Sequence, residues 1–188
     1  MTTQITDKLI YQNKEYYLND ELLEKYFRAF PEKKPETDNM CTALWRGYIA
    51  TFEIRDNEFF VKEMEVLTDV DFGTASILDK IFPDTKKFEW YSGLIRIDSF
   101  RGRFDSEPED GVFEFLEIRN GDLIQKRVMN FEELQVFKKE QYIYFMMTDD
   151  KLPVYQLFKS NNEGITEERI NKIIKEYILR YTREVYVD

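Results

Sequence analysis

The chain contains three segments in which apolar and polar residues alternate on either side of a two-residue turn. They cover residues 9–18, 50–62 and 113–126, with central dipeptides Asn13-Lys14, Asp56-Asn57 and Asn120-Gly121. Asn, Asp and Gly tolerate the positive φ angles that a two-residue type I′ turn requires. We therefore predict that each dipeptide joins two adjacent antiparallel strands. Residues 90–97 are predicted to form a further strand.

The second and third hairpins also resemble each other. Residues 52–59 align with residues 116–123 without a gap, and a Trp precedes each hairpin, Trp45 and Trp90. The similarity has two interpretations, a duplicated β unit or two hairpins that converged on the same turn chemistry. We favour convergence, because no period recurs often enough to define a repeat protein.

Apolar residues at helical spacing follow several candidate capping residues. Asn19 or Asp20 can cap a helix that ends near Phe30. Thr74 can cap a short helix that ends near Phe82. Two helices are thus predicted within the β-rich part of the chain.

The last third of the chain is predicted to be helical. Asn130 and Glu133 have the spacing of a capping box, which predicts a helix from Phe131 to about Tyr144. A separate helix is predicted over residues 153–160. A final helix begins at Thr166 and places these apolar residues on one face: Ile170, Ile173, Ile174, Tyr177, Ile178 and Tyr181.

The order of elements predicts an α+β fold. We expect one antiparallel sheet of about six or seven strands, built from hairpins, with the C-terminal helices packed on one face. No linker rich in Gly, Ser or Pro divides the chain. The expected organisation is a single domain over residues 1–188, β-rich over 1–129 and helical over 130–188.

The composition excludes several kinds of chemistry. The chain has no His and only one Cys, so Cys–His and Ser–His–Asp catalysis, an internal disulfide and a structural zinc site are all ruled out. It contains neither a Walker loop nor a GxGxxG motif. We therefore expect a protein without catalytic activity, metal or cofactor.

The charge and hydropathy patterns bear on partners and location. With 27 basic and 37 acidic residues the net charge is −10, and no basic lobe is present, so we expect no direct contact with nucleic acid. The longest apolar run, residues 142–147, is far shorter than the roughly 20 residues of a membrane span. No signal peptide is recognisable, and we expect a cytoplasmic protein.

One candidate ligand site combines aromatic and cationic side chains around the two Trp residues. It consists of Trp45, Arg46, Tyr48, Trp90 and Arg96. Trp, Tyr and Arg together offer stacking, hydrogen bonding and a positive charge, which suits a small ligand or a carbohydrate. The interpretation we favour for residues 44–54 is a central strand in the core, with Arg46 paired to a carboxylate at the mouth of the strand.

Two motifs in this region also resemble a family of small uncharacterised bacterial proteins. They are residues 44–54, Leu-Trp-Arg-Gly-Tyr-Ile-Ala-Thr-Phe-Glu-Ile, and the Trp-Tyr-Ser-Gly-x-Ile-Arg-Ile of residues 90–97. The resemblance covers about residues 9–129. It implies a bacterial or phage origin and carries no activity with it.

A second candidate site is an acidic loop between strands, with four carboxylates at Asp105, Glu107, Glu109 and Asp110. We expect a non-catalytic protein that binds another, basic protein, as inhibitors and immunity proteins do, with these acids as the contact. A merely solvated loop is the alternative. The aromatic and Met residues of 142–147 leave room for a docking surface or a homodimer, although core packing accounts for most of them.

Overall fold

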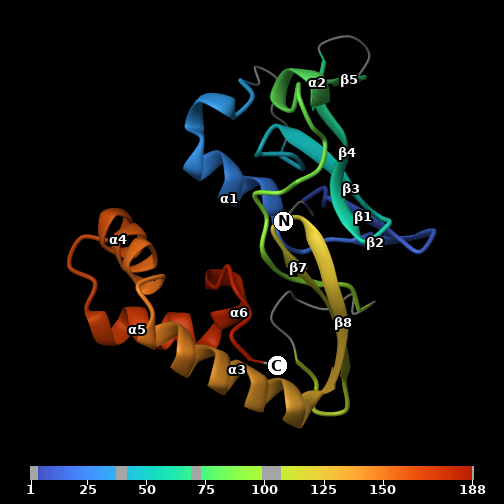
Figure 1. Cartoon of the computed structure of the whole chain (residues 1–188). Helices are drawn as coiled ribbons and strands as arrows, with labels where there is room; N and C mark the ends of the chain where they lie inside the picture. Colours follow the sequence, from blue (N-terminus) through green and yellow to red (C-terminus); the bar gives the residue numbers. More distant parts are fainter. Residues whose placement is uncertain (1–3, 37–41, 69–72, 99–106, 188) are drawn as a thin grey trace.

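The computed structural model describes residues 4–36, 42–68, 73–98 and 107–187, and within them the fold is α+β (Figure 1). The strands are β1 (Lys8–Tyr11), β2 (Lys14–Tyr17), β3 (Tyr48–Arg55), β4 (Glu58–Leu67), β5 (Thr74–Ser76), β6 (Gly93–Arg96), β7 (Val112–Arg119) and β8 (Asp122–Asn130). The helices are α1 (Leu22–Ala29), α2 (Leu78–Ile81), α3 (Phe131–Met147), α4 (Lys151–Asn161), α5 (Glu167–Glu176) and α6 (Ile178–Tyr181), with a 3-10 turn, η1, over Pro31–Lys33.

The predicted hairpin turns are confirmed for the second and third hairpins. Asp56 and Asn57 have φ angles of 53° and 63° and join the antiparallel strands β3 and β4. Asn120 and Gly121, with φ angles of 49° and 76°, join β7 and β8. A Cβ at Gly121 would lie 2.8 Å from the Cα of Glu89, so this position requires glycine for space as well as for its backbone angle.

The first hairpin forms with its turn shifted by one residue. Gln12 and Asn13, rather than Asn13 and Lys14, have the positive φ angles, and Tyr11 pairs with Lys14. This shift keeps Leu9 fully buried on the core side of β1. A one-residue change of register would move that side chain to the other face of the sheet.

The sheet is mixed, which corrects the expectation of a purely antiparallel one. Its strand order is β2-β1-β3-β4-β8-β7-β6, and β5 pairs with β4 beside this path. β1 runs parallel to β3, with Leu9 opposite Phe52. The reason is the crossover through α1, which returns the chain to the sheet in the direction of β1.

The two similar hairpins meet at their tips. Glu58 and Asp122 stand opposite each other, and the flanking bonds run from Phe59 N to Gly121 O (2.8 Å) and from Leu123 N to Asn57 O (2.7 Å). Lys87 holds both carboxylates, at 2.8 Å and 2.7 Å. Because these pairs occupy equivalent positions in the sequence alignment, the junction between the halves of the sheet has local two-fold symmetry.

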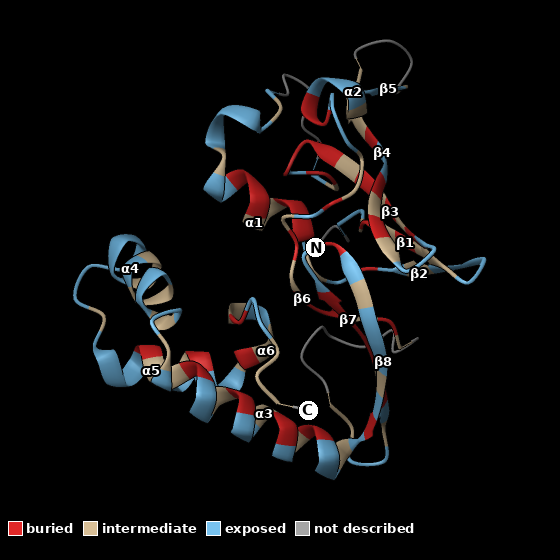
Figure 2. Cartoon of the chain, in the orientation of Figure 1, coloured by how far each residue is buried: buried red, intermediate tan, exposed pale blue. Residues whose placement is uncertain are grey.

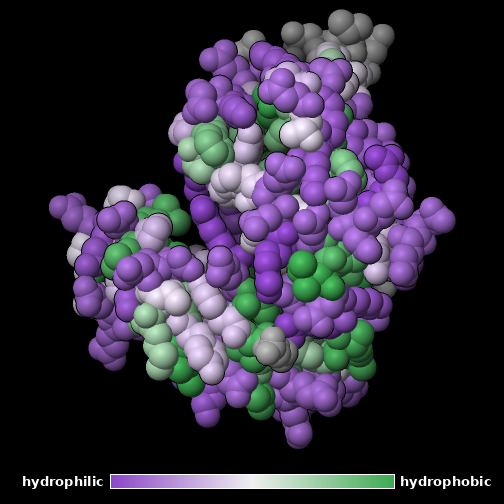
Figure 3. All heavy atoms as spheres, in the orientation of Figure 1, coloured by the Kyte–Doolittle hydropathy of each residue, from purple (hydrophilic) through white to green (hydrophobic). Residues whose placement is uncertain are grey.

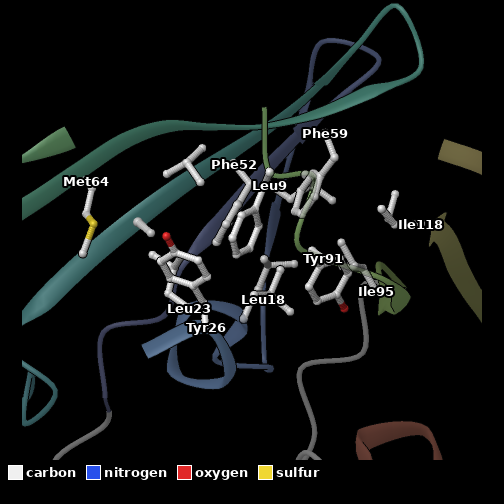
Figure 4. Packing of buried hydrophobic residues seen from close by; sticks show 14 of the residues in the cluster. Leu9, Leu18, Leu23, Tyr26, Phe52, Phe59, Met64, Tyr91, Ile95 and Ile118 are labelled. Atoms are coloured by element: carbon white, nitrogen blue, oxygen red, sulfur yellow. The ribbon is translucent and has the colours of Figure 1, made fainter. Parts of the chain in front are cut away.

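The main core lies between the sheet and α1. Figure 4 shows the rings of Phe52, Phe59 and Tyr91 gathered with Leu9 and Leu18 beneath the strands, and all five are buried. Figure 2 shows that the burial on α1 is confined to the side facing the sheet. Alternate residues of β3 are buried, as its pattern predicts.

The helices differ from the predictions at three points. Neither Asn19 nor Asp20 caps α1, because the helix begins later, after Glu21, and has no side-chain cap. Thr74 begins β5 instead of capping a helix, because residues 74–76 pair with the edge of β4, and α2 begins only at Leu78. The last predicted helix is interrupted at Tyr177, whose φ and ψ are −114° and 34°, and it forms α5 and α6. The capping box of Asn130 and Glu133 is confirmed, with bonds of 2.9 Å and 2.8 Å.

The C-terminal segment is held against the sheet and α3 by the buried side chain of Gln141 and the half-buried side chain of Arg127. Gln141 of α3 donates to the carbonyl of Glu184 (2.6 Å) and accepts from the backbone N–H of Tyr186 (2.9 Å). Arg127 binds the carbonyl of Val187 (3.0 Å) and lies 2.8 Å from a carboxylate oxygen of Glu117. These bonds fix the segment that follows α6 against the rest of the fold.

Candidate functional site

Arg46 forms a buried ion pair, as predicted, but it lies in the turn before β3 and not within a strand over residues 44–54. The strand begins only at Tyr48, because Gly47, with a φ angle of 82°, turns the chain just before it. Its two terminal nitrogens lie 2.9 Å and 2.8 Å from the carboxylate oxygens of Asp7, and one of them also donates to the carbonyl of Ile5 (3.1 Å). The backbone N–H of Ala50 completes the coordination of Asp7 at 2.8 Å. Every hydrogen-bonding contact here is internal, so this pair fastens the N-terminal segment to the sheet.

The buried carboxyl of Asp7 predicts a specific pH dependence. Burial raises its pKa from 3.8 to about 6, although Arg46 and the Ala50 N–H lower it. The folded state thus binds the proton more tightly, and the stabilisation is complete below pH 3.8 and is lost as the pH rises through 6. We expect wild type to lose up to about 3 kcal/mol of unfolding free energy relative to Asp7→Asn across this window.

Urea unfolding of both proteins from pH 3.5 to pH 7.5, with both m-values compared, measures this difference. The Asp7→Asn variant is the reference because it lacks the carboxyl group of Asp7 and keeps all the other titrating groups of the protein. A stability difference that instead grows in favour of wild type with rising pH would show that Arg46 keeps the pKa of Asp7 below that of the unfolded chain.

The aromatic and cationic candidates do not converge on one site. Trp45 is 64% exposed, and its backbone N–H is 3.3 Å from the side-chain oxygen of Gln4. Trp90 packs against Tyr26 and Phe30, with ring centres 5.5 Å and 6.3 Å apart. The described geometry thus places the two Trp residues in different surroundings.

Tyr48 and Arg96 also serve separate contacts. Tyr48 is fully buried, and its hydroxyl donates to Glu24 at 3.1 Å. Burial raises the pKa of this hydroxyl far above its usual range. Arg96 forms a two-fold bond with Asp98, at 2.5 Å and 2.6 Å, and lines a cavity that neither Trp residue lines.

This cavity lies where the sheet meets the C-terminal helices, and its volume is about 220 Å³. Its walls come from the connection between β2 and α1, from β6 and β7, from α3 and from the chain around α6. The apolar part of the lining consists of Leu18, Leu94, Ile95, Phe115 and Leu179. The charged part consists of Asp20, Arg96, Glu107, Lys138, Glu176 and Arg180.

Four cations lie within electrostatic reach of one another, and we call them the cation cluster: Lys25, Arg28, Arg180 and Arg183. Of these, Arg180 also lines the cavity. Burial and the charges of Arg28, Arg183 and Arg180 lower the pKa of Lys25, while Asp20 raises it. In Figure 3, hydrophilic side chains line the hollow between the surface of α1 and that of the C-terminal helices. Sequence analysis missed this cluster because its members lie far apart in the chain and carry no motif.

The structure accounts for part of the predicted acidic loop. Asp105 lies outside the described residues. Glu107 is paired with Lys138 at 2.9 Å and accepts a bond from Gln135 at 2.8 Å, so it anchors the loop to α3. Glu109 and Asp110 are exposed. The described part of the loop therefore presents two solvent-facing carboxylates beside the N-terminal half of α3.

Helix α3 is apolar on two sides, of which only one is covered. Its buried residues are Leu134, Phe137, Gln141 and Phe145. Four other apolar residues of the helix are exposed, and we call them the outer face of α3: Val136 (56%), Ile143 (43%), Tyr144 (50%) and Met147 (75%). At helical spacing Val136, Ile143 and Met147 lie away from the buried residues, and Tyr144 lies at the margin between the two sides. The sequence pattern of 142–147 indicated surplus apolar residues without showing which side they occupy.

The function of the site has to be inferred from its own geometry, because comparison with known proteins finds no match. No protein-family model, no curated protein and no solved structure matches the chain. Within the described ranges, no helix has both the length and the apolar character needed to cross a bilayer. The described residues also contain no cluster of three or more Cys, Asp or Glu that could hold a metal ion.

Proposed function

We propose that this is a non-catalytic cytoplasmic protein that binds a basic protein partner through the outer face of α3. The observation that carries the proposal is the second apolar side of α3, since a helix with apolar residues all round normally covers them against something. The expected bacterial origin and the analogy with inhibitors and immunity proteins belong to the same proposal.

The charges around the outer face define the chemistry of the partner. Five exposed carboxylates accompany it in residues 131–150: Glu132, Glu133, Glu140, Asp149 and Asp150. In the same span Lys139 is the one exposed cation, because Lys138 is half-buried against Glu107. An apolar centre with an acidic margin is complementary to apolar side chains framed by Lys and Arg.

The alternative function, binding of a small ligand by Trp45, Arg46, Tyr48, Trp90 and Arg96, receives less support. Arg46 and Tyr48 are engaged with Asp7 and Glu24 inside the fold. A site for a small ligand needs convergent groups around one concavity. Of these five residues, Arg96 alone lines the cavity described above.

A site-specific crosslinking experiment tests the proposal. A photoreactive phenylalanine replaces Ile143 on the outer face of α3, and in a control protein it replaces Ile124, which is 47% exposed on β8. After crosslinking in the native host, the captured protein is identified and purified. We expect a partner with a pI above about 9, captured at position 143 and not at position 124.

Binding of the purified partner then measures the contribution of the outer face. Tyr144→Asp should weaken the complex by about five-fold or more, because an aromatic anchor residue of an interface commonly contributes more than about 1 kcal/mol. Ile124→Asp should leave the affinity unchanged. Higher ionic strength should slow association.

Three results would overturn the proposal. They are an acidic partner, equal crosslinking at both positions, and capture of a second copy of this chain. The last would identify the outer face of α3 as a homodimer surface.

A further inference from the structure

The cavity between the sheet and the C-terminal helices combines an apolar floor with a cationic rim, which is the arrangement that an amphiphilic anion requires. Arg180 belongs both to the cavity wall and to the cation cluster, and its Nε lies 3.7 Å from Asp20, another wall residue. Leu94 and Phe115, which lie on the same face of the sheet, supply the floor from β6 and β7. The two halves of the site are therefore continuous.

The charges at the rim are unbalanced. Among the described residues, neither Lys25 nor Arg28 forms an ion pair, and Asp20 is the carboxylate that favours the charged form of Lys25. The guanidinium of Arg183 lies over the ring of Trp90, 4.9 Å from its centre, and it meets no carboxylate among the residues that the structure describes. Cations held together in this way repel one another, and a bound anion relieves that repulsion.

The remaining charged residues of the wall are engaged in pairs of their own. Lys138 is 2.9 Å from Glu107, and Arg96 is bonded to Asp98 at 2.6 Å. Glu176 also lines the wall, so the anionic group of a ligand is favoured at the end that adjoins the cation cluster. The apolar body of the ligand then extends over the floor.

We propose that this cavity binds a compact amphiphilic anion, with its carboxylate or phosphate at Arg180 and the cation cluster and its apolar body on Leu94 and Phe115. The volume of about 220 Å³ fits a short aliphatic chain or a single aromatic ring. This site is separate from the outer face of α3 and does not depend on the proposed protein partner.

The test uses octanoate as the probe, with octanol and inorganic phosphate as matched compounds that each lack one half of the chemistry. Binding is followed by the rise in melting temperature with concentration and by backbone NMR shifts. We expect saturable binding of octanoate, with shifts at α1, β6 and α6, and no comparable binding of octanol or phosphate. Equal binding of phosphate, or no saturable binding of octanoate, would overturn the proposal.

Variants that remove single charges test whether octanoate binds in this cavity. Arg180→Gln and Lys25→Gln should each weaken octanoate binding by about ten-fold, which corresponds to one charge-assisted hydrogen bond. Lys172→Gln removes an exposed cation from α5 and should change nothing. Unchanged affinity in both rim variants would show that octanoate binds elsewhere.

The same variants report on the unbound protein. Without octanoate, Lys25→Gln should melt at or above the wild-type temperature, because it removes a half-buried cation from among three arginines. A lower melting temperature would contradict the charge imbalance on which the site rests. Vesicles of phosphatidylglycerol distinguish a membrane lipid from a free anion, and binding to the vesicles without binding of octanoate would also overturn the proposal.

Discussion

Replacing Arg46 by Ala is expected to destabilise the protein by about 3–5 kcal/mol at pH 7.5, because the substitution leaves a buried carboxylate without its counter-charge. The side chain of Asp7 is completely buried and that of Arg46 is 6% exposed. Both terminal guanidinium nitrogens bind the carboxylate, and the carbonyl of Ile5 loses its donor as well. Removal of the arginine therefore leaves several polar atoms unsatisfied.

Urea unfolding measures this loss as a lower midpoint at unchanged slope. Arg46→Lys is the informative control: it keeps the charge without the planar fork, so its cost should be smaller than that of Ala but well above zero. At pH 5 the cost of Arg46→Ala should shrink, since Asp7, with a pKa near 6, then carries its proton. A loss below 1 kcal/mol at pH 7.5 would mean that water reaches the pair.

Local turn chemistry made the hairpins predictable from the sequence. Asp56-Asn57 and Asn120-Gly121 adopt the positive φ angles for which these residue types are suited, and the strands on either side follow. The capping box at Asn130 was predictable for the same reason, since its two partners are three residues apart. Turns and helix caps that depend on residues close together in the sequence can thus be predicted from the sequence.

Features that depend on distant segments were not predictable in this way. The parallel pairing of β1 with β3 follows from the path of the chain through α1, which no turn motif encodes. Thr74 is a residue type that often caps helices, yet it forms part of β5 because this segment pairs with the edge of β4. The cavity combines residues from the connection after β2 with residues around α6, and no sequence pattern brings these together.

The candidate sites show the same distinction. The apolar pattern of residues 44–54 predicted that Arg46 would pair with a carboxylate where a core strand begins, and the pair is confirmed, although β3 starts two residues later. The acidic loop was identified by its composition, but composition does not reveal that Glu107 is taken up by Lys138. The exposed side of α3 could not be assigned without knowing which side α5 and the sheet would cover.

The similarity of the second and third hairpins acquires a structural counterpart. Glu58 and Asp122, which are equivalent in the alignment, are also paired across the junction of the sheet and share Lys87. Such an arrangement is what two copies of one hairpin would form by meeting tip to tip. The symmetric junction is thus an argument for duplication that the turn sequences alone did not supply.

Replacing Ile174 by Asp is expected to leave the protein unfolded or insoluble. Ile174 is completely buried in a cluster with Phe145, Ile170 and Ile178, which joins α3 to α5 and α6. The change removes a burial contribution of roughly 1.5–3 kcal/mol and introduces a carboxylate among apolar side chains. The sum is comparable to the whole stability of a domain of this size, about 5–15 kcal/mol.

Two controls separate this charge effect from a general sensitivity of α5. Ile174→Val keeps the cluster apolar and should cost only about 0.5–1.5 kcal/mol. Ile173→Asp changes a half-buried neighbour, where water can solvate the carboxylate, and should leave a folded protein with a lowered melting temperature. Solubility after expression, far-ultraviolet circular dichroism and thermal melting measure all three variants. A soluble Ile174→Asp protein that melts at the wild-type temperature would show that the cluster does not hold α5 and α6 to the fold. In that case the cluster would also not fix the part of the cavity wall formed by Leu179 and Arg180.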